Sequence, residues 1–157
     1  VFAKEVFKVG PVLLGFLSGM DGLGALVGTL TLASLAGFQR QGTIFLGGSL
    51  LLCFGVLLFS LSWSYLMAIP ILVLAGLGVS GFATTQVTLT MATAEPRMRG
   101  RAMGAIALAI GLLPIGMVFV GSLAEWLGAP KAVTLSSLMG LGIILVLTVS
   151  SSELRRA

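Results

Sequence analysis

The stretch that decides the fold is residues 43–62, TIFLGGSLLLCFGVLLFSLS, which contains no charged side chain. An α-helix needs about 20 consecutive apolar residues to cross the hydrocarbon core of a bilayer. In lipid every backbone N–H and C=O must be satisfied within the segment, which a helix achieves and an open strand does not. Residues 43–62 are therefore predicted to form a transmembrane helix.

Four further windows have the same apolar character, at about residues 11–36, 66–91, 102–124 and 131–150. The five windows are separated by short polar or charged segments at residues 37–42, 62–65, 94–101 and 125–130. Short connections make successive helices antiparallel. The sequence thus predicts an all-α, polytopic bundle of five transmembrane spans.

The composition also indicates that lipid surrounds most of the chain. Of the 157 residues, 57% are hydrophobic and only 9% are charged, and the mean hydropathy is +1.15. Soluble domains carry roughly 25% charged residues, so this chain cannot cover its surface for water. The net charge of +4 comes from short basic clusters between the spans, with no basic face and no interleaved aromatics. Nucleic acid is therefore not expected as a partner.

The basic residues set the orientation. One side of the predicted bundle carries six arginines and the other carries three lysines, which the positive-inside rule interprets as cytoplasmic and outer sides. The expected interfacial aromatics Trp63, Tyr65 and Trp126 fall on the lysine side. The C-terminus is then cytoplasmic and residue 1 is outside. The residues compared are Arg40, Arg97, Arg99, Arg101, Arg155 and Arg156 against Lys4, Lys8 and Lys131.

The start of the chain has no signal-peptide pattern, although residue 1 is expected outside the membrane. An odd number of helices before Val1 would resolve this conflict. We therefore expect residues 1–157 to be the C-terminal transmembrane portion of a longer protein whose N-terminal half is absent. Residues 2–8 would then lie in an outer loop.

Two short motifs suggest enzymes and are rejected. Residues 76–81, GLGVSG, match the dinucleotide fingerprint GxGxxG, but they lie inside a predicted span with no βαβ unit around them. Close helix packing through small residues is the expected role. Residues 78–81 also match a GxSG protease motif, yet the chain has no His and no Asn to act as or orient a base. With a single cysteine, Cys53, we expect no metal, no cofactor and no enzyme activity.

Asp21 is the strongest single candidate for a functional residue, because it lies about ten residues into the first span. A carboxylate at mid-membrane costs on the order of 2.5–3.5 kcal/mol on insertion scales, and such groups commonly serve ion or proton pathways. The alternative is a carboxylate in the outer third of the bilayer that bonds to a neighbouring helix. The sequence leaves both open.

The third predicted span carries Ser80, Thr84 and Thr88 at spacings of four, which places them on one helix face. We assign this face to a substrate or proton pathway. Bonding of the hydroxyls to their own backbone is the alternative. The second span and the fifth span beyond Lys131 contain no charged residue, and both spans are expected to be peripheral, lipid-facing supports.

The fourth span contains Pro114 between Gly111 and Gly116. Proline removes one backbone hydrogen bond, so a kink is predicted there. The flanking glycines favour a hinge, and static packing is the alternative. Small residues four apart support tight packing, at Gly15/Gly19, Gly24/Gly28, Gly100/Gly104 and Ala107/Gly111.

Residues 95–104, EPRMRGRAMG, resemble the P-x-x-R-G-R-x-x-G loop between the tenth and eleventh helices of major facilitator superfamily transporters. The similarity is to the branch of enterobactin, macrolide and multidrug exporters. Residues 22–28, 114–116 and 121–128 also resemble that branch. The loop 37–42 departs from the superfamily, because it keeps only Arg40 of a fuller basic loop.

The resemblance implies twelve helices in two halves, each made of inverted three-helix repeats, with substrate bound between the halves. Our five spans would be helices eight to twelve. Residues Arg97, Arg99, Gly100 and Arg101 would form a cytoplasmic loop or gate.

The sequence therefore predicts part of a secondary active transporter that exports small amphipathic drug- or siderophore-like molecules by alternating access. The expected partners are the lipid bilayer, the missing N-terminal half, a small-molecule substrate and a proton or cation. The expected location is the bacterial inner membrane. The alternative from another class is a non-transporting five-span scaffold or assembly protein.

Overall fold

The computed structural model describes residues 10–34, 41–62 and 64–150, and this part of the chain is helical with short connections. Five helical segments in it are long and apolar enough to cross a membrane, which confirms the predicted five-span bundle. The helices are α2 (Pro11–Ser34), α3 (Gln41–Leu61), α4 (Tyr65–Thr93), α5 (Arg99–Gly111), α6 (Leu113–Leu127) and α7 (Ala129–Ser150).

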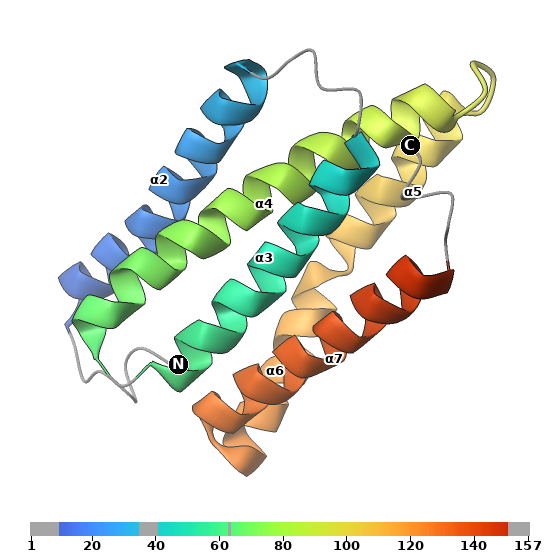
Figure 1. Cartoon of the computed structure of the whole chain (residues 1–157). Helices are drawn as coiled ribbons and strands as arrows, with labels where there is room; N and C mark the ends of the chain where they lie inside the picture. The colour runs from blue at the N-terminus through green and yellow to red at the C-terminus, as the bar shows by residue number, and fades with distance from the viewer. Residues whose placement is uncertain (1–9, 35–40, 63, 151–157) are drawn as a thin grey trace.

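Helix α4 is the centre of the better-packed side of the bundle. It lies between α2 and α3 and packs along both (Figure 1). The approach is close because glycines face the neighbouring backbones. A Cβ on Gly76 would overlap the Asp21 carbonyl oxygen of α2, and one on Gly78 would overlap the Leu52 backbone of α3. The GxGxxG motif is therefore a packing motif within one helix, as predicted.

Helix α3 has α4 on one side and α7 on the other. The Ser60 and Thr134 hydroxyls share a hydrogen bond of 2.9 Å between α3 and α7. Gly140 of α7 lies against Cys53, whose Sγ would be 3.3 Å from a Cβ at that glycine. The second span is thus an interior element of the described bundle. Few residues of α3 are buried, and its role as a peripheral support stays a prediction.

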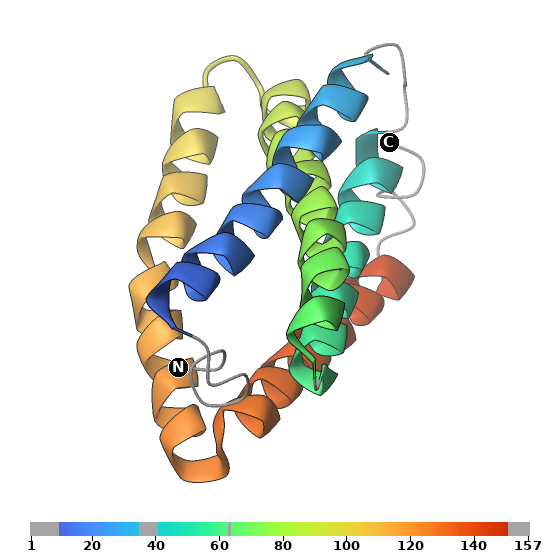
Figure 2. The ribbon, with the colours of Figure 1, turned by 90° about the vertical axis from the view of Figure 1, so that its left-hand side faces the viewer.

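Helices α5 and α6 together form the fourth span, and they stand end to end as one rod (Figure 2). The rod contacts α4 mainly near their connection and contacts α7 through α6. No residue of Arg99–Leu127 is buried, although the segment is strongly apolar. Its large side chains need lipid or another protein segment as a neighbour.

The rod is interrupted at Leu112, two residues before Pro114. The N–H of Leu112 donates to the carbonyls of Leu108 and Ala109, and the N–H groups of Ile115 and Gly116 donate to the Leu112 carbonyl. Because Pro114 has no N–H, the regular i to i−4 pattern cannot continue through it. The predicted break in the fourth span is present, and its movement stays a prediction.

Several predicted features lie outside the described residues. They are the outer loop at 2–8, the basic loop residue Arg40, the interfacial Trp63, and the tail arginines Arg155 and Arg156.

Candidate transport pathway

Asp21 lies near the middle of α2, on the stripe of that helix that faces α4. Leu17, Gly24 and Gly28 on this stripe are buried, and Asp21 is half-buried at its edge. Its backbone oxygen lies beside Gly76, which is itself in the middle third of α4. The carboxylate therefore belongs to the central level of the bundle and not to either end.

Among the described residues, no hydrogen bond or ion pair involves the Asp21 side chain. The polar groups of the same helix behave differently: Thr29 and Thr31 donate to backbone carbonyls of the preceding turn. Asp21 is thus a partly exposed carboxylate at the central level of the bundle, with no partner among the described residues. Such groups in membrane proteins face a water-filled cavity or pair with a neighbouring group.

The predicted polar face of α4 is divided in the structure. Ser80 is buried against Gly28 of α2, and its hydroxyl donates to the Leu77 carbonyl at 2.7 Å. Ser80 also lines a hollow of about 220 Å³ between α2, α3 and α4. Thr84 and Thr88 are exposed, and the Thr88 hydroxyl donates to the Thr84 carbonyl. The Ser80 and Thr88 hydroxyls thus donate to their own helix, so they can offer a bound molecule only their oxygen lone pairs.

Asp21 and Ser80 thus belong to one helix pair. Ser80 follows Gly76, the residue level with Asp21, by a single helical turn. Thr84 and Thr88 continue toward the other end of α4, where the arginine loop begins. The hinge residues are elsewhere: Gly111, Pro114 and Gly116 are exposed on the fourth span, whose main contacts are not with α2.

Three exposed arginines lie where α4 connects to α5: Arg97 is in the connection, and Arg99 and Arg101 are in the first turn of α5. Arg99 Nε donates to the Ala94 carbonyl at 3.4 Å, and no ion pair to these guanidinium groups occurs within the described ranges. Tyr65 begins α4 at the opposite end, where its hydroxyl donates to the Leu13 carbonyl of α2. Trp126, at that same end near the close of α6, is 89% exposed. The described arginines and the described interfacial aromatics therefore lie at opposite ends of the bundle.

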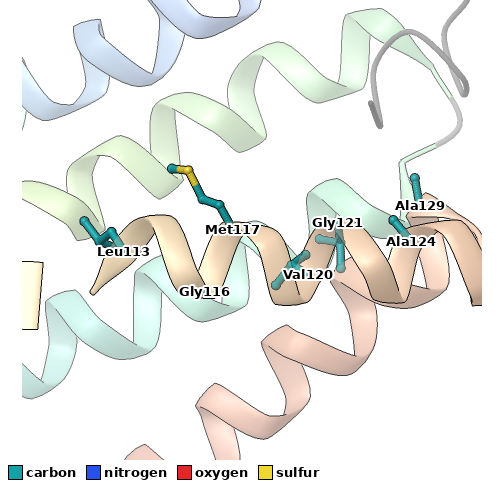
Figure 3. Close-up of a pocket in the computed structure, with 8 residues that line it drawn as sticks. Leu113, Gly116, Met117, Val120, Gly121, Ala124 and Ala129 are labelled. Carbon is teal, nitrogen blue, oxygen red and sulfur yellow. The ribbon is translucent and has the colours of Figure 1, made fainter. Parts of the chain in front are cut away.

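The sequence analysis missed a hollow on the fourth span. A cavity of about 640 Å³ lies along α6 where it meets α7 (Figure 3). Small residues at Gly116, Gly121 and Ala124 recur along its α6 wall, and this spacing was the signal available in the sequence.

Five helices that are long and apolar enough to cross a membrane, with the described arginines at one end of the bundle, define a multi-pass membrane protein. The family model of the Major Facilitator Superfamily matches residues 1–115. The chain therefore belongs to the Major Facilitator Superfamily, and it is a membrane transport protein in general class. No curated protein and no solved structure gives a significant match to the chain.

Proposed function

We propose that the chain is the C-terminal portion of a proton-coupled secondary transporter that exports small amphipathic molecules by alternating access. The observation that carries the proposal is the position of Asp21 at the central level of the α2–α4 pair. The superfamily membership supports transport as the general activity.

Asp21 is suited to coupling because the membrane penalises its charged form. An ionised carboxylate at mid-span costs on the order of 2.5–3.5 kcal/mol on insertion scales, and a bound proton removes most of that charge penalty. In the proposed cycle Asp21 takes up a proton in one state of the transporter and releases it in the other. Alternation between two such states moves a proton with each cycle.

The lining of the hollow between α2, α3 and α4 supports an amphipathic cargo. The hollow that contains Ser80 is walled by Leu32, Ile44, Leu51 and Leu77, with a few hydroxyls among them. Such a surface solvates an apolar body that carries a few polar groups, which is the chemistry of a small amphipathic drug- or siderophore-like molecule.

The remaining features fit a cycle of this kind. The break at Leu112 and Pro114 gives the fourth span a position at which it can bend. The positive-inside rule places the exposed Arg97, Arg99 and Arg101 on the cytoplasmic side. There they would form a gate with acidic groups of the N-terminal half. The proposed location is the bacterial inner membrane, with the C-terminus inside and residue 1 outside.

The test uses the complete gene product in inside-out vesicles and measures ethidium, an amphipathic fluorescent cation, under an imposed proton gradient. We expect Asp21→Asn to lower gradient-driven ethidium movement by about tenfold or more, because the amide cannot carry the proton. Asp21→Glu should retain a substantial part of the activity. Thr29→Ala is the matched control, since Thr29 lies on the same helix and bonds only its own backbone.

Equal transport by Asp21→Asn and the parent would remove Asp21 from the coupling mechanism. Absence of gradient-driven movement in every variant, with the parent protein correctly inserted, would instead favour the five-span scaffold.

A further inference from the structure

Three arginines gather over the short connection between α4 and α5, and we call them the arginine patch. Arg97 lies in that connection, and Arg99 and Arg101 lie in the first turn of α5. All three side chains are exposed. The segment 95–101 holds one acidic residue, Glu95, against these three arginines. The patch therefore carries a net positive charge that attracts anions.

Two contacts show where the guanidinium groups of α5 lie. Arg99 Nε donates to the carbonyl of Ala94, the C-cap residue of α4, at 3.4 Å. Arg101 Nη1 lies 3.9 Å from Sδ of Met98, the residue before α5 begins. Both side chains therefore fold back over the connection and do not extend along the span. Their guanidinium groups thus lie at the end of the bundle, over the backbone that carries Arg97.

Most hydrogen-bond donors of the arginine patch have no acceptor. A guanidinium group presents several N–H donors in a planar fork that fits the oxygens of a phosphate in pairs. The bond from Arg99 to Ala94 uses Nε and leaves the two terminal Nη groups of Arg99. Within residues 64–150, no carboxylate pairs with the patch, and the Arg97 side chain makes no hydrogen bond. The patch can therefore bind one phosphate through several hydrogen bonds at once.

Arg99 and Arg101 occupy an unfavourable place in their own helix. The N-terminus of a helix carries a partial positive charge, which repels cations in the first turn. Helix α5 has no acidic residue in that turn and no side-chain hydrogen bond at its N-cap. An anion held by the arginine patch offsets this repulsion and the repulsion among the three arginines.

The depth of the patch in the membrane selects the kind of anion. Helix α4 ends at Thr93 and α5 begins at Arg99, so the patch lies directly at the end of two transmembrane spans. Lipid headgroups lie at this depth, next to the hydrocarbon core. Basic residues placed immediately cytoplasmic of a transmembrane helix attract anionic lipids. A phospholipid headgroup is therefore the phosphate that the patch meets first.

An exposed stripe of small and apolar residues runs down α5 from the patch. Arg101, Gly104, Ala105 and Leu108 follow one another at spacings of three and four, which places them on one helix face. All four are exposed, and Leu108 is 73% exposed. The face begins with a cation at the end of the bundle and continues as an apolar surface. A phospholipid has the matching order, an anionic phosphate followed by acyl chains.

We propose that the arginine patch binds the phosphate of an anionic phospholipid in the cytoplasmic leaflet. The guanidinium groups of Arg97, Arg99 and Arg101 donate to the phosphate oxygens, and an acyl chain lies along the stripe that ends at Leu108. The bound lipid holds the α4–α5 connection at the membrane surface. The proposal rests on the proposed function only for the cytoplasmic position of the patch, and it needs no transport cycle.

Native mass spectrometry of the purified full-length protein tests the site. The protein in detergent micelles is titrated with dioleoyl phosphatidylglycerol, which is anionic, or with dioleoyl phosphatidylcholine, whose net charge is zero. We expect phosphatidylglycerol to bind in preference. Arg97→Gln and Arg101→Gln should each weaken its binding by about fivefold, the factor that corresponds to one arginine near an anionic lipid. Lys131→Gln is the matched control, because it removes the same charge from an exposed residue at the other end of the bundle and should change nothing.

Arg99→Lys separates a phosphate site from the general preference for basic residues on the cytoplasmic side. It keeps the charge, and with it the signal for topology, but loses the planar fork. We expect phosphatidylglycerol to bind about threefold more weakly, because lysine cannot donate to two phosphate oxygens in parallel.

Equal affinity for the two lipids would overturn the proposal. A loss for Lys131→Gln as large as that for Arg101→Gln, or unchanged binding by both Arg101→Gln and Arg99→Lys, would overturn it as well. Displacement of the lipid by inorganic phosphate at the same concentration would also overturn it, because the patch would then be a site for a soluble anion.

The ethidium assay separates this proposal from the proposed function. Transport that depends on Asp21, combined with no preference for phosphatidylglycerol, would reject the lipid site and leave the transporter function in place. Lipid binding that Arg101→Gln weakens, combined with no gradient-driven ethidium movement by the parent, would reject the function and keep the lipid site.

Discussion

Helices α4 and α6 are both apolar spans that contain several glycines, yet they occupy opposite environments. In α4, Gly76, Gly78 and Gly81 lie against the backbones of α2 and α3. In α6, Gly116 and Gly121 face open space, and no residue of that helix is buried. The comparison teaches that glycine spacing predicts where a membrane helix can be approached closely. Whether the approaching helix belongs to the described chain must be learned from the structure.

The largest expected effect comes from filling a glycine that is already in contact. Gly76→Ala places a methyl group against the Asp21 carbonyl and the backbone at Gly24 and Ala25, none of which can move as a side chain would. We expect a loss of about 3 kcal/mol in unfolding free energy, at the upper end of the usual cost of overpacking. Denaturant titration in mixed micelles, followed by circular dichroism, measures it.

Gly116→Ala is the control for that measurement, since its new methyl group meets nothing within 4 Å. It should leave the stability of the present chain unchanged or raise it slightly through better helix propensity. If Gly116→Ala lowers the unfolding free energy as much as Gly76→Ala does, the contrast between α4 and α6 is wrong.

An intermediate effect is expected at the break in the fourth span. Pro114→Ala restores an N–H that can donate toward the Ile110 carbonyl, which should add about 1 kcal/mol of stability. If the break is used as a hinge, ethidium transport by the complete protein should fall although the protein is more stable. Pro70→Ala is the control, because Pro70 also lies inside a helix, but α4 continues through it without a break. Unchanged transport by Pro114→Ala would reduce the break to a static feature.

The smallest expected effect concerns the polar contact between α3 and α7. A double-mutant cycle of Ser60→Ala and Thr134→Ala should give a coupling of about 0.6 kcal/mol, the average for hydrogen bonds between membrane helices. The coupling is small because each hydroxyl has a backbone acceptor on its own helix, at Leu57 or Pro130, and the hydroxyl that donates between the helices gives up that local bond. A coupling near zero would mean that apolar packing alone holds α7 on α3.

The sequence predicted the five spans to within a few residues, because a bilayer demands length and apolarity that few other environments demand together. It also predicted the break beside Pro114, since a missing N–H acts locally. The small-residue pairs were less informative. Gly24/Gly28 packs on α4, whereas Gly15/Gly19 and Gly100/Gly104 meet nothing among the described residues.

The candidate pathway was only partly predictable. The spacing of Ser80, Thr84 and Thr88 gave one helix face, but not that Ser80 is buried against Gly28 while the two threonines are exposed. The depth of Asp21 became clear only from its position beside Gly76. Both depend on the register between α2 and α4, a tertiary property that no local pattern encodes. The cavity where α6 meets α7 also depends on how the helices pack, so no local pattern predicts it.

The most direct measurement is the stability of Gly78→Leu and Gly121→Leu, made side by side in the same chain. The account predicts a clear loss for Gly78→Leu, whose side chain overlaps the Leu52 backbone of α3, and no loss for Gly121→Leu, whose side chain enters open space. An equal effect at the two positions, whether a loss or none, would contradict the contrast between α4 and α6.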